Sequence, residues 1–100
     1  MIIVTGTIDI DPAKRDAAIE ACNAVMEPTR KEVGCHQYAF SADLSDPGRF
    51  YVTEQWDDEE TMGAHMQSPH LAEFMGKLGE FGVTSAVLKK WINAEERSVF

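Results

Sequence analysis

The residues best suited to chemistry gather in the stretch Phe50–Phe74, FYVTEQWDDEETMGAHMQSPHLAEF. It holds two of the three histidines, His65 and His70, and one of the two tryptophans, Trp56. A histidine has an unperturbed pKa of about 6.5 and can take a proton at neutral pH. An indole can donate a hydrogen bond to a ligand oxygen and stack on an aromatic ring. We therefore expect this stretch to form one wall of a small ligand pocket.

His65 is the first candidate for a catalytic base. On a helix it shares the inward side with Met62 and Met66, so it should face the sheet near Trp56. The alternative is a core histidine that is hydrogen-bonded to the backbone or to Glu54. The methionines fit an adaptable pocket lining, although methionines at this spacing are also typical of a plain core.

Glu54 is a carboxylate in an otherwise apolar strand, on the same face as Trp56. A buried carboxylate must be paired or neutral. One role is to orient His65 and raise its basicity. The slightly favoured alternative is a structural ion pair across a dimer with one of three cations: Lys89, Lys90 or Arg97.

Three further side chains are candidates for substrate contact. Tyr38 and Tyr51 lie on neighbouring expected strands but on opposite faces, so we expect only one, Tyr38, to line the pocket. His70 begins a helix, where a capping or surface role is the alternative. Phe74 falls on the inward stripe of the same helix.

Composition excludes several classes of function. The chain has 100 residues and a formal net charge of −8, which disfavours binding to nucleic acid. No apolar run is long enough to span a membrane, and the N-terminus does not resemble a signal peptide, so we expect a cytoplasmic protein. Cys22 and Cys35 show no metal-binding spacing. The acidic run Asp57–Glu60 is typical of a helix start and does not predict a metal site.

Hydrophobic periodicity predicts a single domain over residues 1–100, with a tail at 95–100. The expected order is β-α-β-β-α-β. The predicted elements are strands at Ile2–Ile10, Cys35–Leu44, Arg49–Trp56 and Val83–Ala94, a helix from Asp11-Pro12 to about Val33, and a helical region over Asp57–Phe81 that is split at Ser68-Pro69. In the second strand, His36 should share a face with Tyr38.

This order favours an α+β, ferredoxin-like fold, in which a four-stranded antiparallel sheet carries its helices on one face. Both faces of the sheet carry large residues: Tyr51 opposes Phe50, and Trp91 opposes Leu88. We therefore expect a homodimer in which a second copy covers the open face.

Three motifs carry a resemblance to a known family: Gly34-Cys35-His36-Gln37-Tyr38, Glu54-Gln55-Trp56 and Ala64–His70 (AHMQSPH). Together on this frame, over about residues 1–94, they resemble the antibiotic biosynthesis monooxygenase (ABM) superfamily, in its quinol monooxygenase-like branch. The resemblance implies a dimeric α+β barrel. It also implies oxidation of phenols or hydroquinones by molecular oxygen with no cofactor, in a pocket between sheet and helices.

Two departures from the family pattern argue against particular activities. The haem-degrading relatives carry an asparagine on the first strand and a tryptophan on a helix, whereas strand Ile2–Ile10 has no asparagine and the helices after Trp56 have no tryptophan, which counts against haem degradation. Val52 stands where polyketide-tailoring relatives carry an asparagine, so a tailoring mechanism that uses this asparagine is not expected.

The function we expect is a cofactor-independent monooxygenase for a small phenolic or quinol compound. His65 would be the base, and Trp56 and Tyr38 would position the substrate. Residues expected to bind the substrate are Glu54, His70, Met62, Met66 and Phe74. The alternatives are a non-catalytic dimer that binds a small molecule, and an isomerase-like enzyme for a small carbonyl signalling metabolite.

Overall fold

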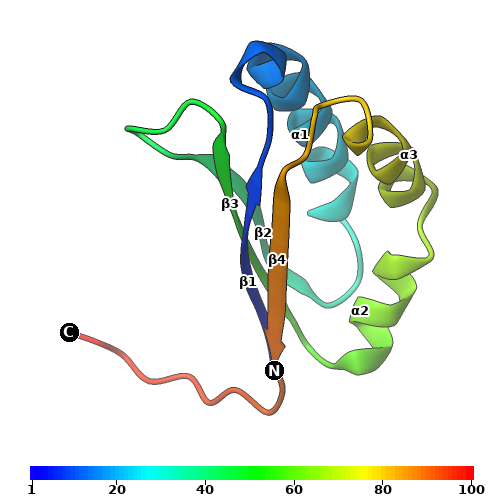
Figure 1. Cartoon of the computed structure of the whole chain (residues 1–100). Helices are drawn as coiled ribbons and strands as arrows, with labels where there is room; N and C mark the ends of the chain where they lie inside the picture. The colour runs from blue at the N-terminus through cyan, green and yellow to red at the C-terminus, as the bar shows by residue number, and fades with distance from the viewer.

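The structure is a computed structural model that describes all 100 residues. One sheet and a set of helices form two layers (Figure 1). The elements in chain order are β1 (Ile2–Asp9), a 3₁₀ turn (Pro12–Lys14), α1 (Arg15–Thr29), β2 (Cys35–Ala42), β3 (Arg49–Trp56), α2 (Glu59–Met66), α3 (Pro69–Leu78) and β4 (Ser85–Trp91).

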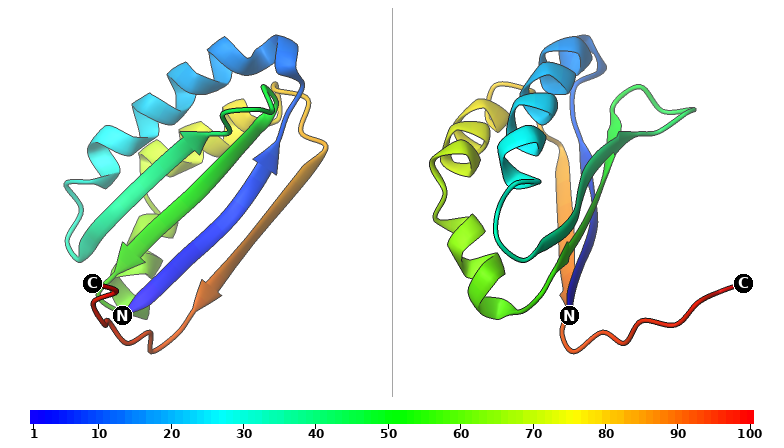
Figure 2. Two further views of the ribbon diagram at one scale, coloured as in Figure 1. Left: turned by 90° about the vertical axis from the view of Figure 1, so that its left-hand side faces the viewer. Right: turned by 180° about the vertical axis from the view of Figure 1, so that it is seen from behind.

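The four strands form one antiparallel sheet in the order β2-β3-β1-β4. All three α-helices cover the same face, and the other face is open (Figure 2). This is the ferredoxin-like arrangement, which confirms the predicted α+β fold class. The register places Val4 opposite Glu54 and Gly6 opposite Val52, and the burial of Val4, Val52 and Glu54 shows that this side of the strands lies beneath the helices.

The first helix ends earlier than the predicted limit near Val33. Asp11 caps the 3₁₀ turn by accepting from the Ala13 amide at 3.0 Å, and α1 then runs only to Thr29. Pro28 lies in the last turn and has no N–H to continue the hydrogen-bond ladder. The chain then tightens, because Lys31 N bonds to Pro28 O, three residues back.

The predicted split of the second helical region is confirmed. The Asp58 side chain accepts from Thr61 N at 2.9 Å and starts α2. Ser68 Oγ accepts from Leu71 N at 3.3 Å and starts α3, with Pro69 in the first position. α3 stops at Leu78, short of the predicted Phe81.

Three strands are shorter than predicted, β1 by the single residue Ile10, and one strand-face assignment was wrong. β2 ends at Ala42, and β4 spans Ser85–Trp91, because pairing with β1 ends there. A register shift between Cys35 and Gln37 marks a β-bulge. The bulge rotates His36 away from the Tyr38 face to solvent, where it pairs with Asp57.

The core fills the space between the sheet and the helices. The buried apolar residues from the sheet alternate as predicted, and they meet the small residues of α1: Ile2, Val4, Ile8, Tyr38, Phe50, Val52 and Trp56 against Ala18, Ala21, Cys22 and Val25. No helix is long and apolar enough to cross a membrane. Beyond Ala94 the tail leaves the sheet with Val99 and Phe100 fully exposed (Figure 1).

Candidate functional site

Trp56 is the most deeply buried large side chain, with no exposed surface. It ends β3, and two residues earlier on the same face lies Glu54. The indole Nε1–H donates to Glu54 Oε1 at 2.9 Å. The pair is local in sequence, because residues two apart on a strand point to the same side. The donor of Trp56 is thus committed to Glu54.

His65 lies against this pair. Its side chain is almost fully buried, and its ring stacks on Trp56 with centroids 4.9 Å apart and 28° between the planes. The Tyr38 ring meets His65 edge-on, with centroids 5.0 Å apart. The imidazole of His65 therefore packs between two aromatic side chains of the sheet.

Glu32, in the turn after α1, completes the cluster. Its Oε2 lies 2.6 Å from His65 Nδ1 and 3.1 Å from His70 Nε2. Sequence reasoning missed this residue. A signal was present, because Glu32 continues the inward spacing of α1 by one step of three residues beyond Thr29.

These contacts fix the tautomer of His65. A carboxylate can only accept hydrogen bonds, so Nδ1 of His65 must carry the proton that it shares with Glu32. In the neutral ring Nε2 then holds a lone pair. Nε2 makes no hydrogen bond within the chain. Glu32 therefore orients His65 as a carboxylate orients a histidine base.

A cavity of about 310 Å³ lies between the four-stranded sheet and the two short helices, α2 and α3. Its walls are mostly apolar, and the polar side chains in them are Tyr38, Glu54 and His65. The apolar wall residues are Ile8, Phe40, Val52, Met66, Leu71, Ala72, Phe74, Met75, Leu78, Ala86 and Leu88. The volume is at the lower end of small-molecule sites.

The predicted site residues divide into two groups. Tyr38, Glu54, His65, Met66 and Phe74 line the cavity. The others do not line it: Trp56 stands behind His65, Met62 is packed against the core, and His70 borders the far side of Glu32.

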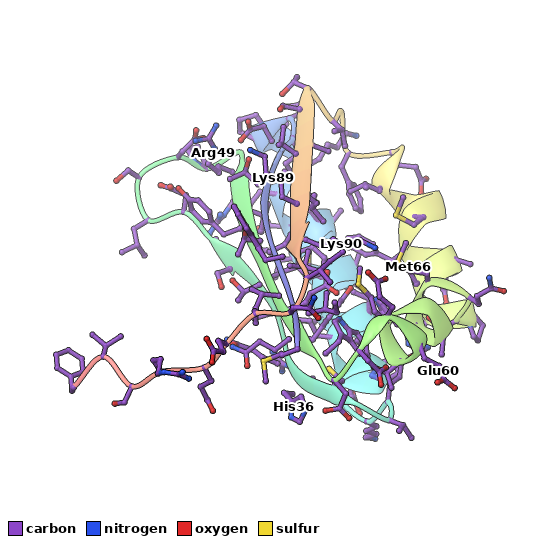
Figure 3. All side chains as sticks on the ribbon, turned by 90° about the horizontal axis from the view of Figure 1, so that it is seen from below. His36, Arg49, Glu60, Met66, Lys89 and Lys90 are labelled. Atoms are coloured by element: carbon purple, nitrogen blue, oxygen red, sulfur yellow. The ribbon has the colours of Figure 1, made fainter.

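The exposures of the methionines differ from those of simple core residues. Met66 was expected to point inward, yet both Met66 and Met75 are more than half exposed while lining the cavity. They therefore lie at its rim. Figure 3 shows Met66 on the short helices, whereas His36 pairs with Asp57 just before α2 begins.

Burial raises the pKa of two side chains in the site, Tyr38 and Glu54. Burial raises the pKa of Tyr38 above its ordinary value, and the nearby Glu54 and Glu32 carboxylates add to the rise. Tyr38 thus stays protonated at neutral pH. Burial also raises the pKa of Glu54, and the hydrogen bond from Trp56 and the charge of His65 partly oppose the rise.

The expected structural ion pair of Glu54 does not fit this geometry. Glu54 points to the helix-covered face, away from any copy that docks on the open face. Lys90 instead pairs with Glu59 of α2 at 3.0 Å, and Arg97 pairs with Glu95. Figure 3 shows Lys89 and Lys90 on opposite sides of β4.

Two groups of side chains that could ligate a cation differ in their geometry. In the run Asp57–Glu60, Asp58 caps α2, and the two glutamates lie in its first turn, as expected for helix-start electrostatics. Glu32, His65 and His70, in contrast, bring one carboxylate oxygen and two ring nitrogens within 4.8 Å of one another.

With this geometry established, comparison with known proteins identifies the class. The model of the family "Antibiotic biosynthesis monooxygenase" matches residues 1–77. The chain belongs to this family, as the three sequence motifs predicted.

Relatives and solved structures agree with this assignment. An uncharacterized Synechocystis protein, sll1783, is 30% identical over 98% of this chain and 67% of its own length. The Escherichia coli protein named "Probable quinol monooxygenase YgiN" is 27% identical over 74% of this chain and 81% of its own.

Two solved structures share the fold. A Deinococcus radiodurans protein described under the same family name has a TM-score of 0.91 and 28% identity, over 100% of this chain and 99% of its own. A conserved Methanosarcina mazei protein has a TM-score of 0.85 and 26% identity, over 93% and 92% of the two chains.

Proposed function

We propose that this protein oxidises a small phenolic or quinol compound with molecular oxygen, without a cofactor, using His65 as the base. One observation carries the proposal. His65 Nδ1 is held by Glu32, and its Nε2 has no partner in the chain, while the ring lines an apolar cavity. The family and the name of the E. coli relative support the reaction type.

The chemistry needs a base because a phenolate gives up an electron far more readily than a phenol. Nε2 of His65 takes the phenolic proton, and the Glu32 carboxylate stabilises the imidazolium that forms. Hydroquinone and one O₂ then give hydroxyquinone and water, so one oxygen atom enters the product and the other leaves as water. The apolar walls keep competing water from the intermediates.

Tyr38 is the proposed donor to the substrate oxygen. Its hydroxyl makes no hydrogen bond within the chain, and its raised pKa keeps it protonated. Such a donor stabilises the developing oxyanion. Trp56 takes a different role from the expected one, because its N–H is bound to Glu54. We assign it to positioning His65 by stacking.

The other predicted substrate-binding residues follow the cavity. Phe74 and Met66 contact the substrate from the helix side, and Glu54 lies at the inner end. His70 acts through Glu32 and does not touch the substrate.

We also propose that the working unit is a homodimer that pairs the open faces of two sheets. Tyr51, Val87 and Trp91 lie exposed on that face. Apolar side chains gathered on an uncovered sheet favour a second copy.

Oxygen consumption tests the function. Metal-stripped protein is mixed with a panel of hydroquinones in an oxygen electrode, and products are analysed by mass spectrometry for the added oxygen atom. We expect His65→Gln to lower the rate by about 100-fold or more, the usual range for loss of a general base. The His36→Gln control, which alters an exposed histidine, should keep the wild-type rate.

Three outcomes would count against the proposal. Equal rates for His65→Gln and wild type would show that His65 is not the catalytic base. Product formed without oxygen would favour an isomerase. A rise in melting temperature with ligand, but no turnover of any panel member, would favour a binding module.

A further inference from the structure

One carboxylate and two imidazoles meet where α2, α3 and the turn after α1 come together. Glu32 Oε2 lies 2.6 Å from His65 Nδ1 and 3.1 Å from His70 Nε2. All three potential ligand atoms are within 4.8 Å of one another. These three residues, the Glu32 cluster, come from three separate segments of the chain.

We propose that the Glu32 cluster is a binding site for a divalent transition-metal ion of the zinc type. Two imidazoles and a carboxylate are a donor set that suits such ions, and three protein ligands leave a position for water or another ligand. At metal–ligand distances of about 2.0–2.1 Å, neighbouring ligand atoms on a tetrahedral ion are roughly 3.3 Å apart. The observed 2.6 and 3.1 Å need only small side-chain adjustments to reach this spacing.

The two histidines are held in place before any ion binds. Ser68 lies between them, where its hydroxyl donates to His65 O at 2.7 Å and accepts from Leu71 N at 3.3 Å. This one side chain closes α2 and caps α3, so it sets the angle between the helix ends that carry His65 and His70. The stack on Trp56 fixes the plane of the His65 ring. Such preorganisation lowers the entropy cost of binding.

The electrostatics favour a cation. Glu32 has no lysine or arginine partner, and its only ion-pair partners are the two histidines. The Glu54 carboxylate is near enough to interact with Glu32, and the whole chain carries a net charge of −8. A divalent ion would relieve the repulsion between these two carboxylates.

Solvent can reach the cluster from the His70 side. The side chain of His70 is 21% exposed and that of Glu32 is 18% exposed, whereas that of His65 is 2% exposed. An ion can therefore enter past His70 and meet the buried ligand last.

Binding would change the protonation pattern of His65. A metal on Nδ1 requires its lone pair, so the proton now shared with Glu32 moves to Nε2. Nε2 would then be a donor toward the cavity and no longer a base. This consequence rests on the proposed function and predicts slower oxygen uptake in metal-loaded protein. The binding site itself does not depend on that function.

Calorimetric titration of the full, tag-free protein tests the site. The protein is stripped with a chelator, exchanged into metal-free buffer and titrated with ZnCl₂. CoCl₂ is added in parallel to follow the visible absorption of the bound ion. Wild type is compared with Glu32→Gln, His70→Gln and, as a matched control, His36→Gln. Glutamine at 70 keeps a donor for Glu32, and melting curves verify that each variant is folded.

We expect one tight equivalent of Zn²⁺ per chain in wild type and His36→Gln. Since loss of a supporting residue around a metal site already costs 10–100-fold in affinity, loss of Glu32 or His70 as a ligand should raise the dissociation constant at least about tenfold. Equal affinity in all four proteins, or no one-to-one phase in wild type, would overturn the proposal. Oxygen uptake by the metal-free protein is measured separately, so either proposal can fail alone.

Discussion

The rings of Trp56 and His65 stack with centroids 4.9 Å apart and 28° between their planes, although they come from different elements. Each ring is also held by a carboxylate: Glu54 accepts from Trp56, and Glu32 bonds to His65. The site is therefore a two-ring stack with one acid at each end. Its parts should depend on one another, and this coupling can be measured.

Replacing Trp56 by phenylalanine should destabilise the protein by about 1–3 kcal/mol, because the buried Glu54 carboxylate loses its donor. Urea denaturation followed by circular dichroism measures the change. The double-mutant cycle with Glu54→Gln isolates the pair, since an unpaired amide costs less than an unpaired carboxylate. An equal cost of Trp56→Phe in both backgrounds would contradict the proposed coupling.

Glu54 should make stability fall as the pH rises. Burial raises its pKa in the folded state above the ordinary value of 4.5, so the folded state binds the proton more tightly. Below pH 4.5 this contribution is fully present, and it is lost as the pH rises through the folded-state pKa. The unfolding free energy of wild type, relative to Glu54→Gln, should decrease over that window. An increase in this relative unfolding free energy with pH would disprove a raised pKa of Glu54 in the folded state.

Gly6 should resist substitution because β4 passes close to it. A Cβ added there would lie 2.4 Å from Val87 O and 2.7 Å from Leu88 Cγ. Gly6→Ala should therefore cost about 1–3 kcal/mol through overpacking, and it should displace Leu88, which lines the cavity.

Gly76→Ala is the matched control for that substitution. Gly76 lies in α3, and an added Cβ would meet nothing within 4 Å. The change should stabilise the protein by about 0.5–1 kcal/mol, because alanine is the better helix former. Thermal unfolding of both variants checks the pair, and equal melting temperatures would disprove the packing argument at Gly6.

The two thiols should react at different rates. Burial raises the pKa of Cys22 to about 11, while Cys35 is only partly buried and its pKa is raised less strongly. Since the thiolate is the reacting species, a disulfide reagent at pH 8 should modify Cys35 first. Peptide mass spectrometry identifies the modified residue, and both should react at once in denaturant. Faster labelling of Cys22 in the folded protein would contradict its burial.

The proposed dimer predicts an apparent mass of about 22 kDa, twice the 11.1 kDa of one chain. Trp91→Glu places a charge on the open face of the sheet and should shift the mass toward that of the monomer. Val33→Glu is the control, because Val33 is exposed in the turn after α1, away from that face. Light scattering on a sizing column measures the masses of wild type and both variants. A monomeric wild type would disprove the proposed dimer.

Local sequence was enough to place most elements and their inward faces. Alternation along β1 and β3 put Val4, Val52 and Glu54 on the covered side, because residues two apart on a strand share a face. Ser68-Pro69 marked the break between α2 and α3, since an N-cap acts on amides only three residues away. The motifs also placed the chain in its family.

Tertiary structure decided how the site is assembled. Glu32 meets His65 and His70 across 33 and 38 positions of sequence, and no local spacing specifies that meeting. The bulge that turns His36 outward arises from pairing between two strands. Sequence alone therefore determined which side chains of β1 and β3 face the interior, but not the outward turn of His36 or the exposure of Met66. Only the packing of α1 against α3, which brings the turn with Glu32 to both short helices, decided which of them touch, because contacts between distant segments depend on how whole elements dock.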